Sequence, residues 1–590
     1  MTSLSVGVAY LLSLIPYFAV PSIIVYSSLR ATGHILNFNI PTWALFISTT
    51  VARPLLTSFR HRYQYYQDAK AAERLGARLV PHNPEHALTV VKKALKSITD
   101  EFPGGLMHNW SLQHGHSFTI DRLSSRTIIS SDPDLVKAML ATQFDSFEKG
   151  REFTGQMNSL LGNGIFNVDG EMWKFHRAMT RPFFTRERIS DFETYDRNCE
   201  TSMNLAKIRL RQGEPVEFQD LAARFTLDSA TEFLCGHNVG SLGAGLPYPP
   251  SSPHQLAPEL TSHPSNVFVR AFALGQHLAA SRTALAEDWP IAELLGDKVV
   301  PWRRVMDDFT GPLMEVALRK WRNQEKEKYM SGKVNAGDEK DEDLNLLAYL
   351  VRHTQDPKIL KDELVNLMVA GRDTTACLLT YSLYMISQHP AVEDRLREEI
   401  YEKAGTSGTP NYEHMREMKY MRAFLNEVLR LYPPVPNNVR RSNVPVLVPP
   451  KVPGEKPFYI PANTSILYSV INIHRRTDLW GPDALEFDPM RFIDSRVNKY
   501  ITPNPYIFCP FNAGPRICLG QQFAYHEATF FLVRLLQRFK KFKLDDRYNV
   551  SPPDHWKTSN EGTKKKEKIH SLSDLTMYVK GGLWVQMEEI

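Results

Sequence analysis

Long stretches with apolar residues at helical spacing dominate the chain, and short apolar runs typical of strands are few. Residues 357–388, 392–404, 415–431 and 520–539 have the periodicity of helices with one buried face. The strand-like runs are 118–121, 127–130, 464–473 and 583–587. The pattern predicts a mainly α fold with small β-sheets, organised as one large domain from about residue 63 onward.

The N-terminal segment has a different pattern. Residues 2–29 contain no charged side chain, and about 20 apolar residues suffice for a membrane-spanning helix. A second, weaker apolar stretch at 35–52 contains Asn37, Asn39 and Pro41, so it either spans or lies in the membrane interface; a buried soluble helix is the alternative for both stretches. We expect residues 1–62 to form a membrane anchor of one or two apolar segments, followed by the large domain at 63–590.

Positive charges mark the side of the membrane on which the domain lies. Arg53, Arg60 and Arg62 directly follow the apolar stretches, and the positive-inside rule places such residues in the cytosol. Two spans would keep the N-terminus on the cytosolic side as well, whereas one span would place it across the membrane.

Composition excludes several functional classes. The 70 Lys and Arg against 65 Asp and Glu leave a net charge of only +5, and no basic stripe with interleaved aromatic residues supports a nucleic-acid partner. The five cysteines form no CxxC pair or regular framework, which argues against a disulfide scaffold or a zinc site. Residues 246–265, 324–343 and 557–568 are rich in proline or charge, and we expect exposed loops there.

One cysteine stands in an unusual local sequence. The segment from Phe511 to Gly520 reads F-N-A-G-P-R-I-C-L-G, a glycine-containing loop that ends at the start of an apolar helix. The N-terminus of a helix favours a thiolate at Cys518, and a thiolate is a good axial ligand for haem iron. Arg516 can pair with a haem propionate, and Gly520 lets the following helix approach a porphyrin closely. The alternative is a buried structural cysteine.

This segment resembles the haem-binding signature of the cytochrome P450 superfamily, F-x-x-G-x-R-x-C-x-G, with every position filled. The resemblance extends over about residues 55–590. It implies the cytochrome P450 fold, haem b (iron protoporphyrin IX) as cofactor and Cys518 as the iron ligand. No flavin or nicotinamide domain follows the motif, so the resemblance also implies that a separate NADPH-cytochrome P450 reductase supplies the electrons. It places both proteins on the endoplasmic reticulum membrane.

A second motif lies midway in the longest predicted soluble helix. Ala370 to Thr375 reads A-G-R-D-T-T and resembles the A-G-x-D/E-T-T motif of the superfamily. A glycine and threonine hydroxyls are unfavourable inside a helix, which suggests a functional patch. Asp373 and Thr374 can relay the protons that cleavage of dioxygen needs. An ordinary helix with back-bonded threonines is the structural alternative.

Three charged residues resemble the structural triad of the superfamily. Glu427 and Arg430 form its E-x-x-R, and Arg491 supplies the third member. We expect the triad to hold the loop before the cysteine and to take no part in the chemistry. His176 and His474 are interpreted as structural histidines, because a thiolate already occupies the axial position.

The resemblance also identifies residues for the haem propionates. Trp173 and Arg177, four residues apart on one helix face, resemble the W-x-x-x-R of the superfamily, and Arg440, or its neighbour Arg441, matches a further propionate arginine.

Several stretches resemble the fungal membrane-bound branch that hydroxylates n-alkanes and fatty acids, among them 164–167, 181–184, 480–484 and 518–524. The proline-rich insertion at 246–265 instead resembles wood-rot basidiomycete relatives, whose broader substrates include aromatic compounds. We expect Ala370, Val435, Pro436 and Leu575 to face the substrate, a wall that suits a small apolar molecule.

Four functions follow in order of preference. The first is a membrane-bound monooxygenase that hydroxylates alkanes or fatty acids at or near the terminus, and the second is a broad-specificity monooxygenase that detoxifies aromatic xenobiotics. The third is a hydroperoxide isomerase or dehydratase, which would not need the proton relay. The fourth is a non-enzymatic haem protein, which predicts a second strong axial ligand and no spectral shift with substrate.

Overall fold

The computed structural model describes residues 4–185, 189, 192–253, 262–331, 344–450, 454–558 and 564–590. Of the three predicted loops, residues 254–261, 332–343 and 559–563 lie outside these residues. The prediction of a loop was wrong for 324–331, because the helix that starts at Val300 continues to Ser331. The third loop was expected to be exposed, but Lys564 at its described C-terminal side is buried. The Nζ atom of Lys564 lies 2.9 Å from Glu101 Oε2.

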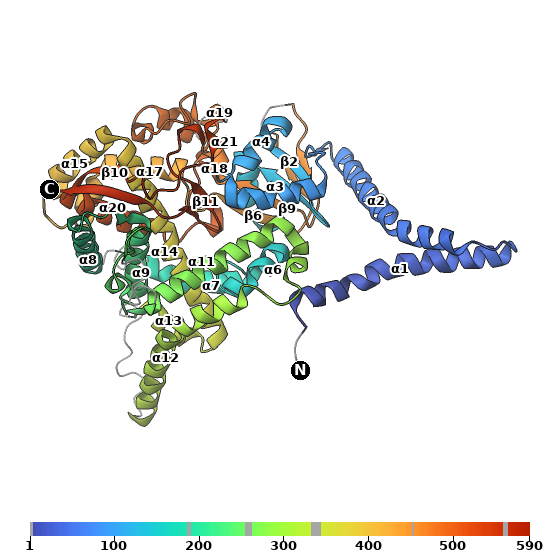
Figure 1. The fold of residues 1–590 in the computed structure, drawn as a ribbon, viewed down its shortest axis with the longest axis horizontal. Helices are drawn as coiled ribbons and strands as arrows, with labels where there is room; N and C mark the ends of the chain where they lie inside the picture. The colour runs from blue at the N-terminus through green and yellow to red at the C-terminus, as the bar shows by residue number, and fades with distance from the viewer. Residues whose placement is uncertain are drawn as a thin grey trace.

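Helices form most of the body, as predicted (Figure 1). Those of the first half are α3 (Ala87–Asp100), α4 (Gly105–His114), α5 (Pro133–Lys137), α6 (Gly150–Leu161), α7 (Gly170–Thr180), α8 (Phe192–Arg211), α9 (Phe218–Cys235), α11 (Pro264–Arg282) and α12 (Val300–Ser331). Those of the second half are α13 (Leu346–His353), α14 (Pro357–Gln388), α15 (Pro390–Ala404), α16 (Tyr412–Glu417), α17 (Lys419–Leu431), α18 (Val470–Ile473), α19 (Thr477–Trp480), α20 (Gln521–Arg538) and α21 (Asp554–Lys557).

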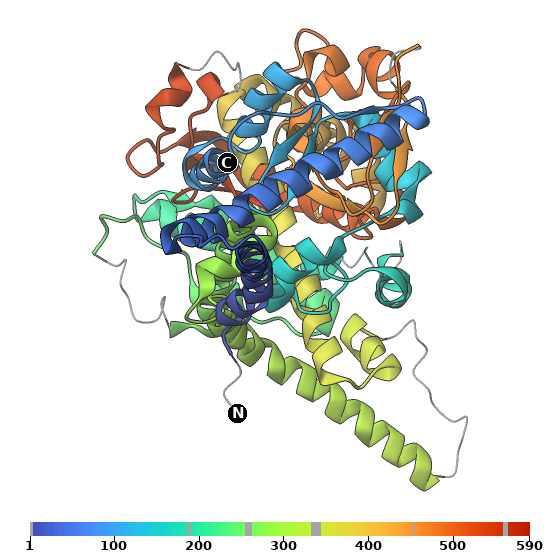
Figure 2. The same ribbon diagram turned by 90° about the vertical axis from the view of Figure 1, so that its right-hand side faces the viewer.

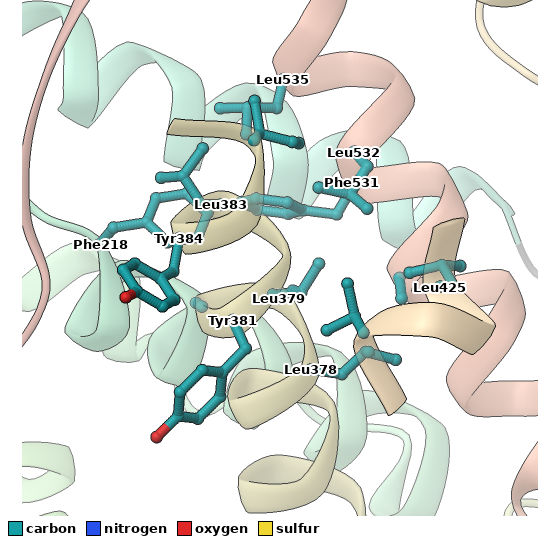
Figure 3. Close-up of a cluster of buried hydrophobic side chains, with 14 of the residues drawn as sticks. Phe218, Leu378, Leu379, Tyr381, Leu383, Tyr384, Leu425, Phe531, Leu532 and Leu535 are labelled. Atoms are coloured by element: carbon teal, nitrogen blue, oxygen red, sulfur yellow. The ribbon is translucent and has the colours of Figure 1, made fainter. Parts of the chain in front are cut away.

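Helix α14 is the central element of the core. The side chain of Asp356 caps its first turn by accepting the N–H of Lys358, and Pro357 occupies the first helical position, where its missing N–H costs nothing. Its buried side chains pack against α9, α17 and α20. Figure 3 shows part of this cluster around Leu379 and Leu383. The helix thereby carries the A-G-R-D-T-T motif into the interior.

The predicted helix at 415–431 is divided. Met418 leaves helical backbone geometry (φ −73°, ψ 79°) and separates α16 from α17. The carboxylate of Glu399, on α15, accepts the N–H groups of Tyr420 and Met421 at 2.8 Å each. A tertiary cap therefore starts a new helix inside a continuous apolar pattern.

The sheets are small. The largest has the order β2-β3-β9-β6-β4, formed by β2 (Ser117–Asp121), β3 (Arg126–Ser130), β9 (Ser465–Ser469), β6 (Asn437–Ser442) and β4 (Phe147–Glu148). Strands β3 and β9 are parallel with Ile128 opposite Ile466, whereas β6 and β9 are antiparallel. The remaining strands are β1 (Arg78–Leu79), β5 (Val216–Glu217), β7 (Val446–Val448), β8 (Phe458–Ile460), β10 (Phe539–Leu544), β11 (Ser571–Ser573), β12 (Met577–Val579) and β13 (Trp584–Glu589).

The N-terminal segment forms a helical hairpin that projects from the body (Figures 1 and 2). Helix α1 (Val6–Ile35) packs against α2 (Thr42–Arg74). Helix α1 has a mean hydropathy of 2.0 over its most apolar window, none of it buried, and is long enough to cross a bilayer. The apolar part of α2 is shorter, Thr42–Ala52, and the expected boundary between residues 62 and 63 falls inside this continuous helix.

Candidate functional site

A cavity of about 570 Å³ lies between α14 and the loop that carries Cys518. Its size is that of a cofactor or ligand site. Beyond these two elements its wall includes residues of α7, β6, α20 and the turn between β11 and β12. Motifs far apart in the sequence thus face one cavity.

Cys518 lies between a short 3₁₀ turn, η11 (Gly514–Arg516), and the start of α20, and it lines the cavity. Its N–H donates to the carbonyl of Phe511 at 2.9 Å, which closes the loop. Gly514 has φ +66°, and a Cβ there would lie 1.6 Å from the carbonyl oxygen of Leu140. The signature glycine is therefore required by backbone contact alone, independently of any cofactor.

Two influences act on the thiol of Cys518. The side chain of Cys518 is exposed to the cavity. Desolvation by the surrounding protein raises the pKa of its thiol, whereas the N–H of Gly520 and the charge of Arg177 lower the pKa. The thiol of Cys509, which also lines the cavity, has a pKa raised to about 12 by burial alone. The surroundings therefore favour a thiolate at Cys518 over one at Cys509.

The predicted propionate residues meet along one edge of the cavity. Arg177 Nη1 donates to the carbonyl of Ile517 at 2.7 Å, and the Arg516 guanidinium lies 4.6 Å from the centre of the Trp173 ring. Arg440 is 1% exposed, and its Nε has no hydrogen-bond partner among the described residues. An unpaired buried guanidinium nitrogen indicates a missing anionic partner.

Sequence reasoning missed Lys149, which lines the same edge. Its Nζ donates to Asn438 Oδ1 at 2.8 Å. Burial, and then the charges of Arg440 and Arg516, hold the pKa of this lysine well below its ordinary value. Only a fold that brings β6 beside the start of α6 creates this contact, so the sequence contained no signal for it.

The charges along this edge test whether the site fits a haem. Lys149, Arg440 and Arg516 lie close enough to act on one another's pKa, and Asp169 accepts a hydrogen bond from Arg516 at 2.6 Å. A dianionic group would relieve the excess positive charge. The two propionates of a haem whose iron faces Cys518 supply that charge, so the residues fit the group.

The expected triad is assembled and fully buried. Arg430 donates to both carboxylate oxygens of Glu427, at 2.7 and 2.8 Å, and Arg491 Nε lies 3.5 Å from Glu427 Oε1. Arg430 also donates to the carbonyl of His474, whose Nε2 accepts the N–H of Cys509 at 3.1 Å. The contacts run from the triad to the chain just before the Cys518 loop.

The two histidines occupy structural positions. Burial lowers the pKa of His474 to about 3, so the ring is neutral, and its Nδ1 lies 3.1 Å from the carbonyl oxygen of Arg430. His176 Nδ1 lies 2.9 Å from Glu363 Oε2, with both side chains at most 1% exposed.

The two expected relay residues point differently. Thr374 lines the cavity, and its hydroxyl donates to the carbonyl of Ala370 at 2.7 Å. Asp373 is absent from the described lining, because Gln276 Nε2 donates to its Oδ2 at 2.6 Å and Arg372 contacts its Oδ1. A partner on α11 thus turns the acid away from the cavity.

Three of the four expected substrate-facing residues line the cavity: Ala370, Val435 and Leu575. Pro436 is not among the described lining residues; it is buried on the β6 side, and its carbonyl accepts the N–H of Ile471. The substrate-facing role of Pro436 therefore stays a prediction, without support from the described lining.

Comparisons with known proteins agree with this architecture. The family model described as Cytochrome P450 matches residues 81–570. The chain is 34% identical to Cytochrome P450 52A3-A of Candida maltosa, over 73% of this chain and 78% of the relative. It is 32% identical to Cytochrome P450 52A6 of Candida tropicalis, over 89% of this chain and 95% of the relative. It is 35% identical to Cytochrome P450 monooxygenase himC of Aspergillus japonicus, over 73% of this chain and 72% of the relative.

Proposed function

The chain belongs to the cytochrome P450 family, and from that premise we propose that it hydroxylates long aliphatic chains, alkanes or fatty acids, at or near the chain terminus. It is an oxidoreductase of the monooxygenase class with haem b as cofactor. The family generally takes electrons from a redox partner and acts on apolar substrates.

We assign the cofactor to the cavity edge described above. Cys518 would bind the iron, and Trp173, Arg177, Arg440 and Arg516 would hold the propionates. When bound through a thiolate, the haem supplies the activation of dioxygen. Lys149 would add a further cation on the same edge.

Two residues of α14 would deliver protons in this proposal. The hydroxyl of Thr374 faces the cavity and can exchange its bond to the Ala370 carbonyl for one to a water molecule. Asp373 would supply the proton after release from Gln276 and Arg372. The relay therefore requires a side-chain rotation of the acid.

The composition of the cavity wall supports the aliphatic substrate. Away from the charged edge, Ala370, Val435, Leu575, Val369 and Leu367 present small or aliphatic side chains. Such a wall suits a hydrocarbon end, and two charged lining residues, Arg122 and Glu152, lie 3.6 Å from each other as an ion pair. The likeness to the alkane-hydroxylating branch adds support at the level of analogy.

The same proposal includes the cellular setting. Residues 1–62 would anchor the protein in the endoplasmic reticulum membrane, and 63–590 would form the monooxygenase domain in the cytosol. Arg60 and Arg62 follow the apolar segments, consistent with a cytosolic position. An NADPH-cytochrome P450 reductase would supply the electrons.

A competition assay tests the substrate. Dodecanoic acid and a polycyclic aromatic compound are offered together to the enzyme reconstituted with a reductase in vesicles. We expect terminal or near-terminal hydroxy acid as the main product. Phenols of the aromatic compound without fatty-acid turnover would contradict the proposal and favour the detoxifying function.

A further inference from the structure

Most of the positive charge in the described cavity wall belongs to the edge assigned to the haem propionates. Lys149, Arg177, Arg440 and Arg516 lie there. The remaining cation of the described lining is Arg122, which follows β2 in the turn to β3. When haem occupies that edge, a fatty-acid carboxylate in the cavity has Arg122 as its candidate partner.

Arg122 already has a carboxylate beside it. Glu152, in the first turn of α6, places its Oε1 3.6 Å from Arg122 Nη1, and the two side chains are 9% and 11% exposed. The hydroxyl of Ser465, on β9, donates to Glu152 Oε2 at 2.6 Å. Arg122 Nη1 donates to the carbonyl of Thr283 at 2.7 Å. Each member of the pair is therefore also held by a neighbour of its own.

The pair is a separate electrostatic unit within the wall. The start of a helix suits the negative charge of Glu152. Burial lowers the pKa of Arg122, and Glu152 is the charged group that opposes this effect. The charges that act on the pKa of Lys149 come instead from the arginines of the propionate edge and from Asp169. The positive charge of Arg122 is thus balanced locally by Glu152.

The other acids of the described lining are paired with cations that are not part of it. Glu101 Oε2 lies 2.9 Å from Lys564 Nζ. Asp574 Oδ1 lies 3.1 Å from His277 Nδ1, and this contact raises the pKa of His277. Glu101 and Asp574 line the cavity, whereas Lys564 and His277 are not among the described lining residues. Outside the propionate edge, the described wall therefore has more acidic than basic side chains.

A fatty acid and an alkane meet this wall differently. A carboxylate close enough to contact Arg122 would also lie close to Glu152, and like charges repel strongly where water is largely excluded. A hydrocarbon end has no charge for Glu152 to repel. Repulsion of one ligand is a common source of specificity for another, and here it acts on the property that separates the two substrate classes.

We propose that Glu152 is a specificity-determining residue, which prevents Arg122 from binding fatty-acid carboxylates and so selects uncharged aliphatic chains, such as n-alkanes. The inference rests on the proposed hydroxylation of aliphatic chains and narrows it to the uncharged ones. A fatty acid would still bind through its hydrocarbon chain, with lower affinity. Glu152 acts on binding and takes no part in the oxidation.

Equilibrium binding to the haem-loaded full-length protein in lipid nanodiscs tests this role. Three ligands share one chain length: dodecane, dodecanamide and dodecanoate, the last at about pH 8.5, where the carboxyl group is ionised. Isothermal titration calorimetry gives a dissociation constant for each. Because dodecanamide has the shape of dodecanoate without its charge, we expect the parent to bind dodecanamide more tightly by about tenfold or more.

Two variants test the residues themselves. Glu152→Gln removes the charge but keeps an oxygen that can accept from Ser465. We expect it to bind dodecanoate about tenfold more tightly than the parent does, the factor for one hydrogen bond to a charged group, with unchanged affinity for dodecane and dodecanamide. In the double variant with Arg122→Gln the gain should disappear, because the freed guanidinium is its source.

Asp121→Asn is the matched control. Asp121 directly precedes Arg122, pairs with Arg126 at 2.8 Å and is not among the described lining residues. Its replacement removes one negative charge from the same region, and all three dissociation constants should stay at the parental values. A gain for dodecanoate in this control equal to that in Glu152→Gln would overturn the proposal, because net charge alone would explain it.

The remaining outcomes separate this inference from the proposed function. Equal affinities of the parent for dodecanoate and dodecanamide would overturn the role of Glu152, and this comparison needs no variant to fold. Parental dodecanoate affinity in Glu152→Gln, or a gain that persists in the double variant, would overturn it as well. A parent that binds none of the three ligands would instead contradict the proposed function.

Discussion

At the residue scale, the two cysteines of the cavity show how surroundings decide reactivity. Desolvation acts on both thiols, but only Cys518 has an N–H group and a guanidinium that oppose the rise of its pKa. The Cys518 motif was readable in the sequence because its members lie within ten residues. The roles of Lys149 and Gln276 could not be read from the sequence. Their contacts, with Asn438 and Asp373 respectively, exist only in the folded chain.

The proposed role of Thr374 predicts how its replacement changes the coupling of NADPH consumption to product formation. Thr374→Ala should keep the haem but consume NADPH with several-fold less product and more hydrogen peroxide, because the hydroxyl no longer positions a proton donor. Product formed per NADPH consumed is the measurement. Thr380→Ala is the control: Thr380 lies on α14, is fully buried and makes the same bond to a carbonyl four residues earlier. Equal coupling in Thr374→Ala and the parent would contradict the relay.

At the element scale, a carboxylate links the C-terminal segment to α14 and α17. Glu567 Oε2 accepts from Tyr384 at 3.1 Å, and its Oε1 accepts from Tyr432 at 2.9 Å. Burial raises the pKa of Glu567 from 4.5 to about 7, against the opposing effects of Arg475 and the two hydroxyls. Helix periodicity predicted α14 and α17, but the contact between them and a distant loop could not be read from it.

This carboxylate predicts a pH dependence of stability. Between about pH 4.5 and 7 the unfolded chain has released the proton and the folded chain retains it, so the free energy of unfolding falls as the pH rises. Glu567→Gln should reduce that fall, by about 3 kcal/mol at most. Burial also raises the pKa of Glu217, to about 8. Part of the fall in unfolding free energy with pH therefore remains in both proteins. Urea unfolding across this range is the measurement, and an identical slope in the variant would contradict the account.

At the scale of the whole molecule, the hairpin returns the chain to the body. Both ends of the α1–α2 pair lie beside the catalytic body (Figures 1 and 2). The apolar pattern predicted both segments but not their pairing, nor the continuation of α2 to Arg74. The docking of α1 depends on Gly7 and Tyr10, which are unremarkable within an apolar sequence.

Glycosylation tests the orientation of the whole molecule. Acceptor sequences occur at Asn109, Asn463 and Asn549. Asn109 and Asn463 are exposed, whereas the Asn549 amide donates to the carbonyls of Asp545 and Trp584. A cytosolic domain should carry no glycan, so treatment with endoglycosidase should not change the electrophoretic mobility of this protein. The same treatment should shift a lumenal glycoprotein of the same membrane, which serves as the control. Sensitive sugar on Asn109 or Asn463 would reverse the orientation.

The central claim is that Cys518 binds the haem iron, and the carbon monoxide spectrum of the reduced protein tests it most directly. Cys518→His should lose the thiolate-type spectrum. Cys509→Ala, which alters the other cysteine of the cavity wall, should keep it. Survival of the thiolate-type spectrum in Cys518→His, or its loss in Cys509→Ala with Cys518 intact, would contradict the assignment.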